Sequence, residues 1–163
     1  MKIYVIGTGT MAKGIVKAFA AKMPVVMKSR TQASLDKAMG SISKSYAKLV
    51  EKGKIAQDAM DAIMANISTT TDYATFADAD LVIEAAVEEM QLKKDVFMEL
   101  DKICKPEAIF ATNSSSLSIT EIAACTSRPT QFIGMHFFNP ADRMALVEVI
   151  KGQVTSCPFK ISG

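Results

Sequence analysis

The sequence predicts an α/β protein of the doubly wound type, with a mostly parallel sheet and helices on both faces. Short apolar runs alternate along the chain with longer segments of helical spacing, which is typical of βαβ units. The first apolar run leads directly into a glycine-rich turn and then into a helical segment, as expected at the start of such a sheet. A single domain of 163 residues buries about 70% of the surface that its unfolded chain exposes.

The first half of the chain alternates strand and helix. Lys2–Ile6 is a short apolar run that ends in glycine, and Thr10–Lys22 has its apolar residues at helical spacing. Pro24–Lys28 is expected to be a second strand, with proline at the position where a missing ladder donor costs least. Thr31 can cap a long helix that ends near Gly53.

The second half continues this alternation. Helices are expected at Gln57–Ala65 and Met90–Cys104, and Ser118-Ile-Thr-Glu121 has the form of a capping box. Short runs bounded by polar residues predict further strands at Asn66–Thr69, Leu81–Glu84, Ala108–Ala111, Gln131–Met135 and Ala145–Ile150. The segment Lys151–Gly163 has neither pattern. We therefore expect one domain over residues 1–155 and leave residues 156–163 unassigned.

Composition and charge exclude several classes of function. Nineteen Lys+Arg against 17 Asp+Glu give a formal net charge of +2, too small for a dedicated nucleic-acid binder. No apolar run is long enough to span a membrane. The three cysteines form no C-x-x-C pair and the chain starts without a signal-peptide pattern, so we expect a cytoplasmic protein. The single histidine, His136, excludes a metal site built from several histidines.

Residues Gly7-Thr8-Gly9-Thr10-Met11-Ala12 form a G-x-G-x-x-A pattern between the first strand and the first helix. Gly7 permits a tight turn, Gly9 lets a pyrophosphate approach the backbone, and Ala12 lets the helix pack on the strand. The helix N-terminus attracts the phosphates. The pattern predicts a Rossmann-type dinucleotide-binding domain with Gly7, Gly9, Thr10, Met11 and Ala12 at the cofactor. A tight strand-to-helix turn without a ligand is the alternative.

The end of the second strand bears on the choice between NAD and NADP. An NAD-binding domain is expected to have an acidic residue about 20 positions after the glycine loop, to accept from the ribose hydroxyls. Here the segment is Lys28-Ser29-Arg30, without a carboxylate. A hydroxyl between two cations would bind a 2′-phosphate, which favours NADP, with Ser29 and Arg30 at the ribose. The alternative is a solvated basic strand end in an NAD enzyme.

Four further motifs follow in order along the chain. They are Leu81-Val-Ile-Glu-Ala-Ala-Val-Glu88, Ala111-Thr-Asn-Ser-Ser-Ser-Leu-Ser-Ile-Thr-Glu-Ile122, Gly134-Met-His-Phe-Phe-Asn-Pro140 and Leu146-Val-Glu-Val-Ile150. With the glycine loop, they make residues 1–155 resemble the 3-hydroxyacyl-CoA dehydrogenase family, particularly its bacterial 3-hydroxybutyryl-CoA branch. The resemblance implies an oxidoreductase that interconverts 3-hydroxyacyl-CoA and 3-oxoacyl-CoA with NAD(P), with 3-hydroxybutyryl-CoA and acetoacetyl-CoA as the expected pair.

The pairing of His136 with Glu148 also follows from the residues themselves. A hairpin centred near Asp142 sets these two positions opposite each other, so that the carboxylate fixes the tautomer of the imidazole. An alcohol–ketone interconversion needs such a group to take or deliver the hydroxyl proton. A histidine buried in the core is the alternative. By resemblance, His136 is the general acid/base, Glu148 its partner, and Ser115 hydrogen-bonds the reacting oxygen of the substrate.

The resemblance also places Glu88, Lys93 and Asn139 near the nicotinamide. Glu88 follows a parallel strand, at the edge where ligands bind such sheets. By its helical position alone, Lys93 would be a solvated charge.

The long helix has an apolar face and a basic face. The apolar face consists of Leu35, Met39, Ile42, Tyr46, Leu49 and Val50, and the basic face of Lys37, Lys44, Lys48 and Lys52. The basic face is either an ordinary solvated surface or a binding surface for the phosphates of coenzyme A. By resemblance, Ser45 and Lys52 contact the coenzyme A moiety.

The sequence departs from the family pattern in three respects. Ser29 replaces the ribose acid, Ala145 stands where a lysine is expected, and the chain stops where the family's second, helical domain should begin. The alternative function is therefore a dinucleotide-binding module with little or no catalysis alone. A missing partner domain also predicts an exposed apolar surface near Ala145–Ile150, and self-association into a homo-oligomer.

Overall fold

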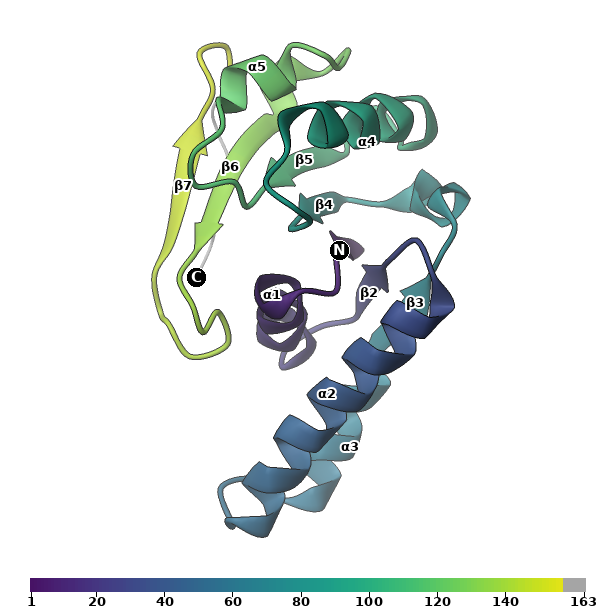
Figure 1. The fold of residues 1–163 in the computed structure, drawn as a ribbon, viewed down its shortest axis with the longest axis vertical. Helices are drawn as coiled ribbons and strands as arrows, with labels where there is room; N and C mark the ends of the chain where they lie inside the picture. Colours follow the sequence, from purple (N-terminus) through teal and green to yellow (C-terminus); the bar gives the residue numbers. More distant parts are fainter. Residues whose placement is uncertain (157–163) are drawn as a thin grey trace.

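A computed structural model describes residues 1–156 and contains one seven-stranded sheet in the order β3-β2-β1-β4-β5-β6-β7 (Figure 1). The strands are β1 (Ile3–Ile6), β2 (Val25–Lys28), β3 (Ile67–Thr70), β4 (Leu81–Glu84), β5 (Ile109–Thr112), β6 (Phe132–Phe137) and β7 (Val147–Lys151). All neighbouring pairs are parallel except β6 and β7, which are antiparallel. Successive strands are added toward one side of the sheet from β1 to β3 and toward the other side from β4 onward, so the order reverses between the neighbouring strands β1 and β4. This topology confirms the predicted doubly wound fold.

Helices cover both faces of the sheet. They are α1 (Thr10–Ala20), α2 (Gln32–Glu51), α3 (Gln57–Ala65), α4 (Met90–Ile103) and α5 (Ile119–Ala123), with short 3-10 helices η1 (Tyr73–Asp78) and η2 (Pro129–Gln131). One buried apolar cluster joins the sheet to α1, α2 and α3, and a second joins it to η1, α4 and α5. Figure 1 shows α2 and α3 side by side in an arm that extends beyond the sheet.

Burial explains why these segments form these elements. All four residues of β1 are buried, as expected for a central parallel strand with both faces covered. Leu35, Ile42 and Tyr46 of α2 are buried, which confirms the predicted apolar face of the long helix. Thr31 caps this helix by accepting a hydrogen bond from the backbone of Ser34.

Two local features differ from what the sequence suggests. The connection between Thr70 and Leu81 contains the helix η1, which the sequence analysis did not predict, and its Phe76 is fully buried. An apolar residue in a polar segment has no periodicity that would indicate a helix. Ser118 accepts from the backbone of Glu121 as a capping box requires, but the Glu121 carboxylate is paired with Lys94 instead.

The unassigned C-terminal segment is ordered at its start. Lys151 belongs to β7, the Thr155 hydroxyl donates to the carbonyl of Phe132, and the Ser156 amide donates to the carbonyl of Thr130. The remainder of that segment lies outside the described residues. Within residues 1–156, no helix is both long and apolar enough to cross a bilayer.

Candidate active site

The glycine loop joins β1 to α1 at the carboxyl edge of the sheet. Gly7 has a φ of +127°, and a Cβ there would stand 2.6 Å from the carbonyl oxygen of Ala85, so only glycine fits. A Cβ on Gly9 would meet no atom within 4 Å, so the space beside its backbone is open. Ala12 is fully buried beneath the loop. The tight turn at Gly7 and the close packing at Ala12 are those that the sequence pattern predicts, and the backbone at Gly9 is open at the helix N-terminus.

A groove of about 330 Å³ continues from this loop along the ends of β1, β2 and β4. Ser29, Arg30 and Tyr73 line it together with Ala85–Val87. Lys28 is only 3% exposed, and its Nζ lies 3.3 Å from the centroid of the Tyr73 ring. Burial lowers its pKa. Both cations that flank Ser29 line the groove, but the Lys28 side chain is buried, whereas Arg30 is exposed.

His136 and Glu148 face each other across the β6–β7 hairpin. They occupy paired positions, and His136 Nδ1 lies 3.0 Å from Glu148 Oε2. Because a carboxylate only accepts hydrogen bonds, Nδ1 carries the hydrogen and Nε2 is left with a free lone pair. The imidazole is 25% exposed, so it is not a residue of the core. The hairpin geometry predicted from the sequence is confirmed.

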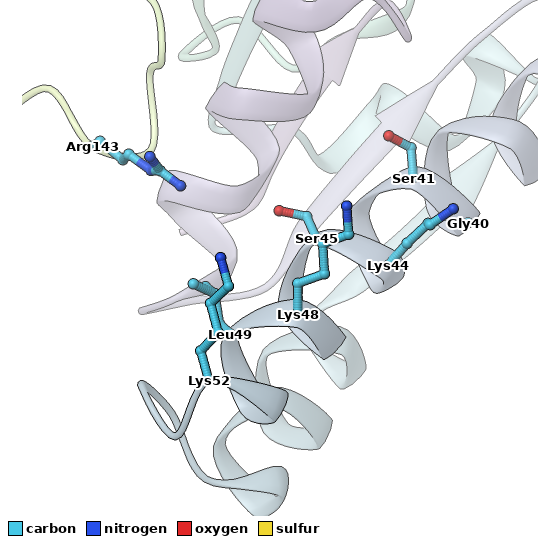
Figure 2. Close-up of a pocket in the computed structure, with 8 residues that line it drawn as sticks. All are labelled: Gly40, Ser41, Lys44, Ser45, Lys48, Leu49, Lys52 and Arg143. Atoms are coloured by element: carbon cyan, nitrogen blue, oxygen red, sulfur yellow. The ribbon is translucent and has the colours of Figure 1, made fainter.

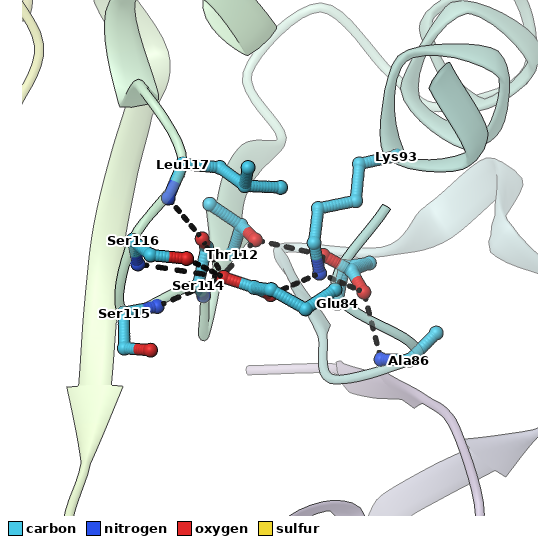
Figure 3. A network of polar contacts seen from close by, with 9 residues as sticks. Glu84, Ala86, Lys93, Thr112, Ser114, Ser115, Ser116 and Leu117 are labelled. Atoms are coloured by element: carbon cyan, nitrogen blue, oxygen red, sulfur yellow. Dashed lines mark hydrogen bonds and ion pairs between the residues drawn. The ribbon is translucent and has the colours of Figure 1, made fainter. Parts of the chain in front are cut away.

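Glu88 is held by the loop that follows β5. Its Oε1 accepts from the hydroxyl of Ser114, from the amides of Ser115 and Ser116 at 3.2 and 3.4 Å, and from the Ser116 hydroxyl at 3.2 Å. The Ser115 hydroxyl has no hydrogen-bond partner among residues 1–156, and no interaction is drawn to it in Figure 3. This leaves the hydroxyl available to a ligand.

Lys93 lies on α4 and is 1% exposed, which contradicts the expectation of a solvated charge. Its Nζ lies 2.8 Å from both carboxylate oxygens of Glu84 and 3.3 Å from Oε2 of Glu88. Glu84 was not predicted as a site residue. The sequence signals are its place at the end of an apolar strand, and the place of Lys93 one helical repeat before the buried Phe97.

Two asparagines connect these parts. Asn113, another residue that sequence analysis missed, accepts from the amide of Phe137 at 3.0 Å and so ties the serine loop to the residue after His136. Asn139 lines a small cavity of about 180 Å³ with Thr10 at the start of α1. The structure thus gathers the glycine loop, Glu88, the serine loop, His136 and Asn139 along one edge of the sheet.

The basic face of α2 borders a separate, open depression of about 580 Å³ (Figure 2). Its lining includes Ser45, Lys52 and the two other lysines, Lys44 and Lys48. Arg143 lines it from the opposite side, on the β6–β7 connection. Lys37 is not among the lining residues. A depression with four cations and no carboxylate in its lining suits a ligand with several phosphates.

Comparison with known proteins identifies the family. The model described as "3-hydroxyacyl-CoA dehydrogenase, NAD binding domain" matches residues 2–158. The chain belongs to the 3-hydroxyacyl-CoA dehydrogenase family. It is 54% identical over 157 residues to the 3-hydroxybutyryl-CoA dehydrogenase of Clostridioides difficile, covering 96% of this chain and 56% of that protein. Over 153 residues it is 43% identical to the fatty acid oxidation complex subunit alpha of Psychrobacter cryohalolentis, covering 93% of this chain and 21% of the other.

Solved structures agree. The 3-hydroxybutyryl-CoA dehydrogenase of Escherichia coli K12 superposes with a TM-score of 0.93 at 38% identity, covering 96% of this chain and 33% of that one. The (S)-3-hydroxybutyryl-CoA dehydrogenase of Ralstonia eutropha superposes with a TM-score of 0.91 at 40% identity, covering 95% and 55%. The chain therefore spans little more than half of the length of these relatives, or less. Family membership confirms the dinucleotide-binding fold and the predicted resemblance.

Proposed function

We propose that the chain is the catalytic nucleotide-binding part of an oxidoreductase that interconverts 3-hydroxyacyl-CoA and 3-oxoacyl-CoA, with 3-hydroxybutyryl-CoA and acetoacetyl-CoA as substrates. The observation that supports this most is the His136–Glu148 pair, with Nδ1 and Oε2 3.0 Å apart, at the same sheet edge as the glycine loop. An imidazole with a free Nε2 beside a dinucleotide groove is what proton-coupled hydride transfer requires.

The residues divide the reaction between them. In the direction of oxidation, Nε2 of His136 takes the proton from the substrate hydroxyl, and Glu148 stabilises the imidazolium that forms. The unpartnered Ser115 hydroxyl hydrogen-bonds the reacting oxygen. A nicotinamide dinucleotide bound at Gly7, Gly9 and the start of α1 supplies the hydride acceptor. Glu88 and Asn139 border the place of its nicotinamide.

The test is an assay of dinucleotide oxidation with acetoacetyl-CoA. The 163-residue chain is assayed alone, and again with its C-terminus extended by the segment that follows the matched region in the Clostridioides difficile relative. We expect turnover in the extended protein. Its absence with both NADH and NADPH would overturn the proposal.

A dinucleotide-binding module with little turnover of its own is the second candidate for the isolated chain. Exposed apolar side chains on and around β7 favour this candidate, because such a surface is normally covered by another domain or subunit. They are Leu146, Val149, Ile150 and Val154. We propose that the domain comprises residues 1–155 and self-associates through this surface. Near-normal turnover by the 163-residue chain would exclude the second candidate, and a monomer by light scattering at high concentration would exclude self-association.

We propose a preference for NADP, supported by the exposed Arg30 next to Ser29 at the end of the groove. Because Lys28 is buried, Arg30 is the cation of this pair that can meet a 2′-phosphate. The double variant Ser29→Asp/Arg30→Ala should shift the ratio of dissociation constants toward NADH by about tenfold or more, since a carboxylate repels the phosphate and accepts from the ribose. An unchanged ratio, measured by fluorescence titration, would remove this argument.

Two further elements complete the proposal. The acyl-CoA substrate places its phosphates in the depression between α2 and Arg143, with Ser45 and Lys52 as contacts. We place the enzyme in the cytoplasm, which is supported by the free thiols Cys104 and Cys125.

A further inference from the structure

Glu84 and Lys93 form an ion pair that is closed to solvent at the carboxyl edge of the sheet, with side-chain exposures of 0% and 1%. Glu84 Oε1 accepts from the amide of Ala86 at 2.7 Å, and its Oε2 accepts from the Thr112 hydroxyl at 2.7 Å. Lys93 donates to both oxygens. The carboxylate is therefore fully satisfied, and neither member of the pair is accessible to a substrate.

Glu88 connects this buried pair to the serine loop, because its two carboxylate oxygens have different partners. Its Oε2 faces Lys93, and its Oε1 faces the amides and hydroxyls of Ser114–Ser116. The Ser114 hydroxyl in turn accepts from the amide of Leu117 at 2.9 Å. Thr112 reaches the same loop directly, because its hydroxyl accepts from the Ser114 amide at 3.3 Å.

We propose that Glu84 and Lys93 are positioning residues that hold Glu88 against the serine loop, and thereby keep the Ser115 hydroxyl free for the reacting oxygen. The last part rests on the proposed function. Lys93 then acts on the serine loop through Glu88. Glu84 fixes the ammonium in place, since an unpaired lysine would not remain charged in so buried a position.

Energetics support a geometric role. A buried ion pair gives little net stability relative to apolar side chains of the same shape, because desolvation offsets the attraction. An apolar pair would leave Glu88 without its cation, however. Burial by itself raises the pKa of Glu88, but the hydrogen bond from Ser114 and the charge on Lys93 outweigh it, so its pKa lies below the usual range.

The decisive variant removes both members of the pair, as Glu84→Gln/Lys93→Met, since either single change leaves a buried group without its partner. The control is Asp101→Asn/Arg128→Met, which removes a second ion pair of low exposure, 2.7 Å between Arg128 Nε and Asp101 Oδ1, remote from the serine loop. Both variants are made in the 163-residue chain and in its C-terminally extended form.

Two readouts separate positioning from stability. The amide proton shifts of Ser115 and Ser116, followed by NMR through the acid range, report the ionisation of Glu88. The charged groups that face Glu88 are Lys93 and, behind it, Glu84. In Glu84→Gln/Lys93→Met the midpoint should move to higher pH, and turnover in the extended protein should fall about 10- to 100-fold, as expected for misplaced reacting groups. The control should leave both unchanged.

An amide titration in Glu84→Gln/Lys93→Met that coincides with that of the unmodified chain would overturn the proposal. A shifted titration with unchanged turnover would overturn the catalytic consequence of the loop position. Because the titration needs no substrate, it decides the positioning role even if the 3-hydroxyacyl-CoA activity is not found, so the two failures remain distinguishable.

Discussion

Two pairs that join a carboxylate to a nitrogen-containing side chain lie at the same edge of the sheet, with similar geometry and different exposure. Glu148 meets His136 at 3.0 Å, with side chains that are 52% and 25% exposed. Glu84 meets Lys93 at 2.8 Å, with side chains that are 0% and 1% exposed. Both pairs follow from the same fold, because β4 and β6 end at the edge where the glycine loop begins α1.

This difference in exposure indicates different roles for the two pairs. A histidine open to solvent and substrate can exchange a proton with a ligand at little cost to folding. A lysine in a buried pair is fixed in position by its partner, because breaking the pair is costly. The first pair is suited to proton transfer and the second to holding the site in position. Removing one member should therefore affect mainly turnover in the first pair and mainly stability in the second.

The largest effect on turnover is expected from His136→Gln in the extended protein. Loss of the proton acceptor should lower turnover about 100- to 10,000-fold, the usual contribution of a general acid/base. The free energy of unfolding should change by less than about 0.5 kcal/mol, because the side chain is partly exposed and its partner stays solvated. Parallel steady-state kinetics and urea denaturation check both parts. A stability loss of several kcal/mol would remove the contrast between the pairs.

The largest effect on stability is expected from Lys93→Met. It leaves Glu84 charged and unpaired in the interior, which should lower the free energy of unfolding by about 3–5 kcal/mol. Lys94→Met is the matched control one residue on, because Lys94 pairs with Glu121 at 2.6 Å in a more exposed position. That change should cost less than about 1 kcal/mol. Equal losses for the two variants, by urea denaturation, would show that burial does not set the value of these pairs.

The same contrast explains which features of the site could be predicted from the sequence. The His136–Glu148 pair was predicted because an antiparallel hairpin fixes its register by counting from a centre, and β7 follows β6 closely along the chain. The element order and the glycine loop were likewise predictable, since each depends on local periodicity and on glycine at defined positions.

The buried pair was missed because it depends on tertiary packing. Glu84 and Lys93 come together only when α4 packs over the end of β4, and charge alone predicted a solvated lysine. The burial of Lys28 was missed for the same reason, since the ring of Tyr73 in the unpredicted helix η1 covers it. In each case a charged residue lies on a buried strand or an apolar helix face, which is a detectable signal.

A smaller effect on stability is expected from a change at Asp101, which tests the role of charge in an ion pair remote from the site. Its carboxylate accepts from the Ser127 amide at 2.6 Å and from Arg128 Nε at 2.7 Å. Burial by itself raises its pKa, but these hydrogen bonds and the Arg128 charge outweigh burial and lower it. A folded-state pKa below the unfolded one gives stability that is present above about pH 4 and lost as the pH falls through the folded value.

Asp101→Asn should therefore lower the free energy of unfolding by about 1–3 kcal/mol at neutral pH, and the difference should shrink as the pH falls below about 4. Urea denaturation of the variant and of the unmodified chain at a series of pH values measures this. A difference that stays constant down to low pH would mean that the Asp101 contacts stabilise the fold without their charge. Burial would then not explain which of these pairs depend on their charge.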